Sequence, residues 1–159
     1  MIVIKKNPNG DTRTAPKDVT FEQFQEANDM HRADVREVMH ELATNLAVAG
    51  NLHDITKKSQ EQMFYRDFLV TMHCGKDFTN SEWYRLHVKE ERHHLFSRCP
   101  EDVNLIDVLE MLADCVCAGM ARSGEIRSLE IDNEILRKAV SNTVELIESM
   151  IVVEVSEDA

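Results

Sequence analysis

Apolar side chains recur at intervals of three and four residues along most of this chain, and this spacing constrains its fold more than any other feature. Between Thr20 and Gly50 the recurring positions, one of them a histidine, are Phe21, Phe24, His31, Val35, Val38, Met39, Leu42 and Leu46. Such spacing places side chains on one face of an α-helix. The 159 residues include only 5 Gly and 3 Pro, so few turns interrupt the pattern. The sequence therefore predicts an all-α protein.

The boundaries of these helices can be predicted from capping residues. Thr20 with Gln23 matches a capping box, so the first helix should begin after Thr20 and end near Gly50, with Asn28-Asp29 as a candidate break. One or two helices are expected over residues 52–73. Single helices are expected over residues 82–96, 100–122 and 132–151.

The two ends of the chain are expected to lie outside a single helical domain of residues 20–153. Residues 1–19 form an arm or a short β-hairpin, in which Ile2-Val3-Ile4 pairs across the turn signal of residues 7–10. Residues 154–159 form an acidic tail.

Charge and cysteine usage limit the partners. The net charge of −11 disfavours nucleic-acid polymers and anionic membranes as partners. No apolar run approaches the roughly 20 residues that span a bilayer, and no signal peptide is visible. The four cysteines lack metal-binding CxxC spacing and are expected to be reduced thiols. We therefore expect a cytoplasmic protein, with a homodimer among the open oligomeric states.

Two histidines and an aspartate in the first part of the chain are candidates for chemistry. His31 shares the apolar helical face of Val35 and should face the core, whereas His40 should face water. His53 and Asp54 are adjacent where a helix is expected to end, so their side chains can fan out toward one metal ion. The alternative for His31 is a hydrogen-bonded core histidine.

The second part of the chain adds three histidines and an aspartate. His87 and His94 are seven residues apart and share a helical face, with His93 about 100° away. Asp114 is the one charged residue in the apolar segment 111–121, where an unpaired carboxylate would be costly to bury. The alternatives are an exposed charged helix for the histidines and a buried hydrogen bond for Asp114. Asp107 and Glu110 share its face and are either further site residues or solvated acids of the first turn.

Together these residues predict a metal site. Imidazole and carboxylate ligands suit one or two divalent ions of Mn, Fe, Co, Ni or Zn, and the missing thiolates argue against a structural zinc site. The predicted ligands are His31, His53, Asp54, His87, His93, His94 and Asp114.

The order of these residues resembles the HD superfamily, whose pattern is His, then His-Asp, then Asp. The resemblance spans about residues 25–122, and the segment 53–57 is similar to the HD-x-x-K form found in cyclic-dinucleotide phosphodiesterases. A small uncharacterised HD-like family is more similar still, with HD-x-S-K, a Trp-then-His segment, a His-His pair and an E-M-L-x-D stretch. In this chain those motifs read Trp83, His87, His93-His94 and Glu110-Met111-Leu112-Ala113-Asp114.

The resemblance implies an HD-domain-like orthogonal bundle of five to seven helices around the metal site. It also implies a metal-dependent phosphohydrolase that acts on a phosphomonoester or nucleotide through a metal-activated water. Asp54 and Lys57 would be catalytic, and Lys57, Lys58 and Arg92 would hold phosphate oxygens. The chain departs from the cyclic-dinucleotide enzymes in lacking Gly-Tyr-Pro after His94. It departs from another nucleotidase branch in having Lys57 where that branch has Glu. The alternatives are a di-iron oxygenase and a non-catalytic, metal-stabilised binding module.

Overall fold

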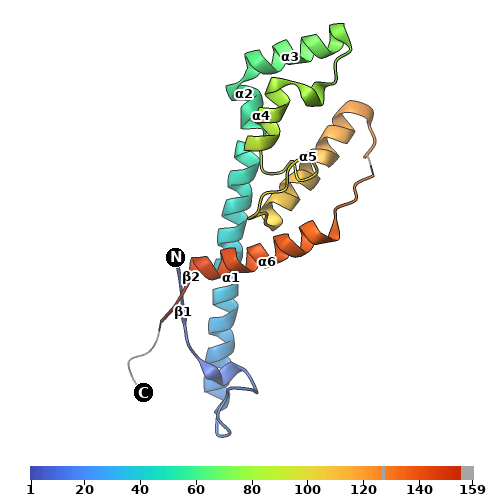
Figure 1. Cartoon of the computed structure of the whole chain (residues 1–159). Helices are drawn as coiled ribbons and strands as arrows, with labels where there is room; N and C mark the ends of the chain where they lie inside the picture. The colour runs from blue at the N-terminus through green and yellow to red at the C-terminus, as the bar shows by residue number, and fades with distance from the viewer. Residues whose placement is uncertain (127, 155–159) are drawn as a thin grey trace. The chain divides into compact units, whose positions relative to one another are not determined.

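A computed structural model describes residues 1–126 and 128–154 of the chain, and these residues are mostly helical (Figure 1). The α-helices of this part are α1 (Phe21–Leu52), α2 (Ile55–Ser59), α3 (Glu61–Cys74), α4 (Glu82–Glu90), α5 (Leu105–Ser123) and α6 (Asn133–Met150). Two strands, β1 (Ile2–Lys5) and β2 (Ile151–Glu154), and two 3₁₀ helices, Pro8–Gly10 and Phe78–Asn80, complete it. The all-α prediction with a small β element is confirmed. None of the described helices is both long enough and apolar enough to cross a membrane.

Backbone contacts divide the chain into two compact units. The terminal unit combines residues 1–45 with the chain from Val144 onward, and the central unit comprises Leu46–Thr143. The predicted domain limits at residues 20 and 153 stay a prediction. Of the predicted acidic tail, residues 155–159 lie outside the described residues.

The strands of the terminal unit correct the predicted hairpin. β1 pairs with β2 in parallel, with Ile2 opposite Ile151 and Lys5 opposite Glu154, so the first strand pairs with the far end of the chain (Figure 1). The predicted turn instead forms the 3₁₀ helix Pro8–Gly10. The Asn7 side chain caps it by accepting the N–H of Asn9 at 3.1 Å, and a proline suits a first helical turn.

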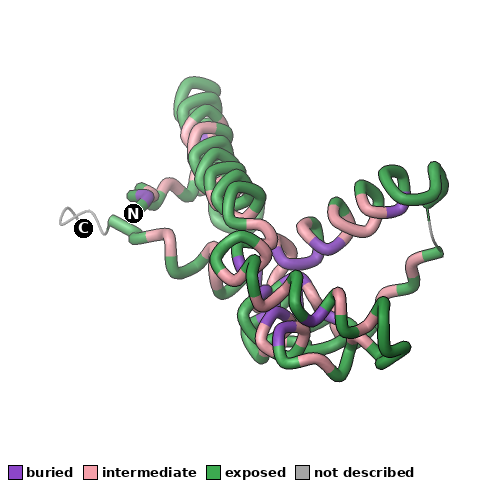
Figure 2. The backbone as a smooth tube through the Cα atoms, turned by 90° about the horizontal axis from the view of Figure 1, so that it is seen from above, coloured by how far each residue is buried: buried purple, intermediate pink, exposed green. Residues whose placement is uncertain are grey.

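Helix α1 begins at the predicted capping box. The backbone N–H of Thr20 donates to Gln23 Oε1 at 3.0 Å, and the N–H of Gln23 donates back to Thr20 Oγ1 at 3.3 Å. The helix continues through Asn28, whose side-chain amide donates to the Phe24 carbonyl at 2.7 Å. It ends two residues later than predicted, at Leu52, and most of it is exposed (Figure 2).

The core of the central unit lies around α5 and the first part of α6. Its buried apolar residues are Leu95, Val103, Val108, Met111 and Ala139. Side-chain hydrogen bonds tie the two helices together: Thr143 Oγ1 accepts the Leu105 N–H at 2.9 Å, and the Asn142 amide donates to the Val103 carbonyl at 2.8 Å.

The segment between α4 and α5 differs from the prediction. Helix α4 ends at Glu90 rather than near residue 96, and α5 begins at Leu105 rather than at Pro100. Asn104 starts α5 in a capping box with Asp107, which explains the later beginning. Residues 91–104 therefore form a non-helical connection between α4 and α5, and two of the predicted metal ligands, His93 and His94, lie near its start.

Candidate metal centre

Asp54 lies at a break between two helices of the central unit. Helix α1 ends at Leu52, α2 begins at Ile55, and Asp54 between them has φ 55°, in the left-handed region. Among the described residues other than glycine, no other has a positive φ. Aspartate tolerates this conformation better than most residues, and such backbone strain often accompanies functional sites. The break turns the adjacent side chains of His53 and Asp54 toward one another.

Three imidazoles surround the Asp54 carboxylate. Nε2 of His53 lies 3.3 Å from Oδ2, while Nε2 of His87 and Nε2 of His93 lie 3.4 Å and 3.7 Å from Oδ1. A fourth imidazole, His94, places its Nε2 2.7 Å from Nε2 of His87. His87 and His93 are buried.

These side chains form two groups that could hold a metal ion, and Asp54 belongs to both. One group is His53, Asp54 and His93, and the other is Asp54, His87 and His94. In each group the ligand atoms lie within 4.8 Å of one another. The prediction that His53, Asp54 and the later histidines converge is thus consistent with the geometry.

Polar atoms at the centre lack hydrogen-bond partners. Oδ1 of Asp54 and Nε2 of His93 are buried, and neither of them forms a hydrogen bond in the described part of the chain. Burying such atoms unpaired is costly, and an ion is one of the ordinary explanations when they occur in a native fold. The orphaned oxygen lies between His87 and His93, so the donor set fits a divalent ion.

Glu110 orients two of the imidazoles. Its Oε1 lies 2.9 Å from Nδ1 of His53, in a hydrogen bond, and 2.9 Å from Nδ1 of His93. Burial would raise the pKa of Glu110, but the two histidines outweigh it and lower that pKa. Burial would likewise lower the pKa of His93, and Glu110 outweighs it and raises that pKa. A carboxylate at Nδ1 leaves Nε2 directed toward Asp54, which is the usual support of a metal-binding histidine.

A second support, through Thr56 and Glu91, holds His87. The Thr56 hydroxyl donates to Glu91 Oε1 at 2.5 Å, and the Thr56 backbone N–H donates to the same oxygen at 2.9 Å. The hydroxyl oxygen also lies 2.6 Å from Nδ1 of His87. Because its one hydrogen goes to Glu91, Thr56 accepts the Nδ1–H of His87, and Nε2 keeps its lone pair. Burial lowers the pKa of His87 to about 4, so this neutral form is the one present at pH 7.

Sequence reasoning missed both members of this support. Thr56 stands at the serine position of the HD-x-S-K motif without a predicted role, and Glu91 lies in a segment for which an exposed charged helix is one of the predictions. Both are buried in the structure, as is Trp83, whose ring stacks on His87 with centroids 4.4 Å apart. The backbone N–H of Trp83 donates to Asp67 Oδ2 at 2.9 Å. The one available signal was the chemical rule that a metal-binding histidine needs a partner at its second nitrogen.

Asp114 and Lys57 complete the centre. Oδ1 of Asp114 lies 3.5 Å from Nε2 of His53, on the side away from Glu110. The Lys57 ammonium pairs with Oδ2 of Asp54. Burial would raise the pKa of Asp54, but Lys57 outweighs it and the pKa is lowered.

Comparison with family models assigns the chain to a protein family. A model described as a family of unknown function, DUF5662, matches residues 20–152. The chain belongs to this family. Comparison with curated proteins and with solved structures found no match.

In this DUF5662 chain, His31 does not lie where the sequence predicted. It is exposed in the terminal unit, so the expectation that it faces the core is wrong. The apolar stripe beside it, with Val35 and Met39, is exposed as well. His40 is exposed, as expected. The two metal-competent groups found among the described residues do not include His31, and its role as a ligand stays a prediction.

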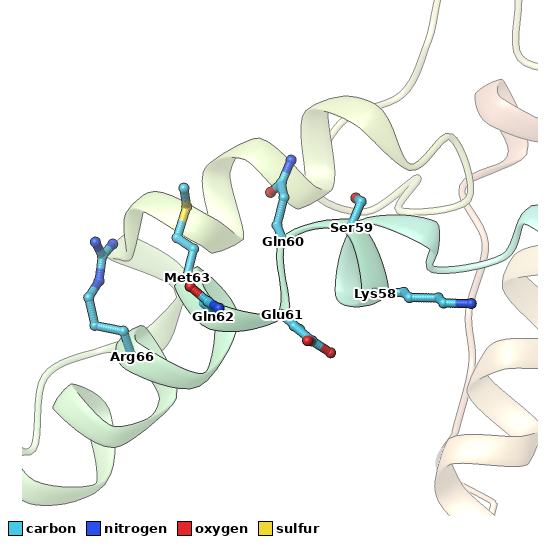
Figure 3. Close-up of a pocket in the computed structure, with 7 residues that line it drawn as sticks. All are labelled: Lys58, Ser59, Gln60, Glu61, Gln62, Met63 and Arg66. Atoms are coloured by element: carbon cyan, nitrogen blue, oxygen red, sulfur yellow. The ribbon is translucent and has the colours of Figure 1, made fainter.

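The predicted phosphate-binding residues also separate. Lys58 is exposed and lines a hollow of about 670 Å³ beside α2 and α3, and none of the residues that line this hollow belongs to the candidate metal centre. In Figure 3, Lys58 lies at one end of this hollow and Arg66 at the other. Arg92 clamps the buried Asp107 with two hydrogen bonds of 2.8 Å and also bonds Asp102, contacts that raise its pKa. Asp107 is therefore a buried member of the α5 capping box that is paired with Arg92, rather than a solvated acid. Substrate contacts of Lys58 and Arg92 stay predictions, and only Lys57 of the three contacts the centre.

Proposed function

We propose that this DUF5662 chain is a metal-dependent phosphohydrolase that acts on a phosphomonoester or a nucleotide. One observation carries the proposal: a half-buried carboxylate, Asp54, has histidine nitrogens on both sides and one buried oxygen without a hydrogen bond. A set of nitrogen and oxygen donors suits Mn, Fe, Co, Ni or Zn better than Mg or Ca. Because two groups share Asp54, the centre has donors for one ion or two.

The residues of the centre have separable roles in such a reaction. A divalent ion, when bound, would lower the pKa of a bound water and so supply hydroxide near neutral pH. Asp54 would contribute an oxygen to each side of the centre. Glu110 and the Thr56–Glu91 pair would hold the imidazoles of His53, His93 and His87 with Nε2 directed toward Asp54, the orientation that metal binding needs.

Lys57 is the group we assign to the substrate. A protonated ammonium cannot coordinate a metal, but it can neutralise a phosphoryl oxygen. In the structure it pairs with Oδ2 of Asp54, the oxygen that Nε2 of His53 also approaches. If that oxygen is a ligand, Lys57 loses its partner and can turn to the substrate from one helical turn away.

The resemblance to the HD superfamily supports the same function, and free cysteines at all four positions support a cytoplasmic location. A shared carboxylate between histidine pairs would equally suit two irons, so an oxygenase is the second candidate. Its substrate would need no phosphate and therefore no Lys57.

Metal analysis of the purified protein, followed by a phosphoester panel, tests the proposal. We expect one or two transition-metal ions per chain and release of inorganic phosphate from at least one monoester or nucleotide. Bound iron with oxygen uptake and no phosphate release would favour the oxygenase. Bound metal without turnover of any kind would leave a binding module.

A further inference from the structure

A hollow of about 480 Å³ lies beside the metal centre in the central unit. Its apolar wall comes from the end of α1 and from α5, through Leu46, Gly50, Leu109, Ala113 and Cys117. Its volume lies in the range of small-molecule sites in proteins, which are mostly apolar with a few polar groups at one side.

The polar side of this hollow is the metal centre itself. His53, Glu110 and Asp114 line the hollow, and the same His53 contacts Asp54 and Asp114 through Nε2. A molecule that reacts at the centre can therefore extend directly onto the apolar wall. No lysine or arginine is among the lining residues described, and the two carboxylates disfavour a second anionic group.

Gly50 gives an independent reason to regard the hollow as a binding space. It lies within α1, where glycine is less favourable than alanine. Its φ is not positive, since Gly75 and Gly124 are the described glycines with that conformation. A Cβ built on Gly50 would meet no atom within 4 Å. Neither backbone strain nor packing thus requires glycine here, whereas a side chain would reduce the space beside His53.

We propose that this hollow receives an apolar, ring-sized group of the substrate, attached to the part that reacts at the metal centre. The inference rests on the proposed function and narrows its substrate class. The preferred substrates would be esters of an aromatic or branched apolar group, and small hydrophilic esters such as glycerol phosphate would be poor ones.

A pair of hydroxamates tests the hollow separately from the phosphate chemistry, because hydroxamates chelate the metal whatever the reaction. Calorimetry on the metal-loaded protein should give benzohydroxamate an affinity about tenfold or more above that of acetohydroxamate, from burial of the ring. Equal affinities, or weaker binding of benzohydroxamate, would overturn the proposal, as would a protein that binds no metal. Selective binding without phosphate release would keep the hollow and refute the phosphohydrolase.

Variants locate the effect. Gly50→Phe should abolish the benzohydroxamate advantage and leave acetohydroxamate binding unchanged, and the milder Gly50→Ala should reduce it while favouring the helix. Val48→Phe is the matched control, since Val48 is exposed, lies about 200° round α1 and does not line the hollow. If both Gly50 variants fold and still bind benzohydroxamate more tightly than acetohydroxamate, the ring does not bind in this hollow. The same conclusion follows if Val48→Phe loses this preference equally.

Discussion

Nε2 of His87 and Nε2 of His94 lie 2.7 Å apart, aimed at one another. Thr56 takes up the N–H of His87 on the opposite side of its ring, so Nε2 of His87 is an acceptor. Burial lowers the pKa of both imidazoles, and the nearby imidazole of His93 lowers the pKa of His94 further. The pair thus shares a single proton in the structure, and a metal ion bound by both nitrogens would have to displace that proton.

Replacement of Asp54 by Asn should remove metal from both sides of the centre. The amide keeps the size of the side chain but loses the charge that both ligand groups share. Metal content after dialysis should fall at least about tenfold. Asp29→Asn is the matched control, because Asp29 is an exposed partner of Arg32 in the terminal unit. Retention of full metal content in Asp54→Asn would refute the shared-ligand assignment.

Thr56→Val should weaken metal binding although Thr56 contacts no metal-facing atom. The valine keeps the shape but leaves His87 free to take the other tautomer, and loss of such a support typically costs about 10- to 100-fold in affinity. Thr56→Ser restores the hydroxyl and should restore most of the affinity. If serine and valine behave alike in metal titrations of folded protein, Thr56 has only a packing role.

Lys57→Ala should keep the metal and lose turnover. Removal of a group that stabilises developing charge typically costs about 10²-fold in kcat. Lys58→Ala provides the control, since this neighbouring lysine is exposed. Loss of metal from Lys57→Ala, or full activity on the true substrate, would contradict the assignment.

Asp67→Asn should destabilise the protein in a pH-dependent way. The backbone N–H of Trp83, ahead of Arg66, holds the pKa of Asp67 below its usual 3.8, although burial opposes this. A lowered folded-state pKa adds stability that is fully present above 3.8 and is lost as the pH falls through the folded value. At pH 7 the variant should lose about 1–3 kcal/mol, the cost of breaking hydrogen bonds to a buried charge.

The fluorescence of Trp83, the one tryptophan in the chain, can follow this unfolding in urea. The difference between the two proteins should shrink as the pH is lowered below 3.8. An equal difference at neutral and acidic pH would mean that Asp67 acts through its shape and not through its charge.

The helices could be predicted from the sequence because their signals are local. Thr20 with Gln23 caps α1 as predicted, and Gly75 and Gly124 end α3 and α5 in the left-handed conformation. The pairing of β1 with β2 could not be predicted in this way. It joins residues about as far apart in the chain as they can be, and no turn signal marks such a pair.

The residues that could bind a metal were easier to predict from the sequence than the residues that hold their imidazole rings in place. His53, Asp54 and the later histidines stand out because they are rare residue types in a recurring order. Glu91 looked like a solvated helical residue, and it becomes buried only because α4 ends before it and the chain turns back. His31 was expected inward from periodicity alone, yet periodicity cannot say whether an apolar face is packed.

Asp54 is the residue that both candidate ligand groups share, so the position of a bound metal ion is the most direct test. Crystals soaked in zinc should give anomalous difference peaks beside Asp54, within about 2.0–2.2 Å of its oxygens and of Nε2 of its neighbouring histidines. One peak or two, bounded by His53 and His93 or by His87 and His94, would agree with the account. Peaks confined to exposed carboxylates, with none at Asp54, would contradict it.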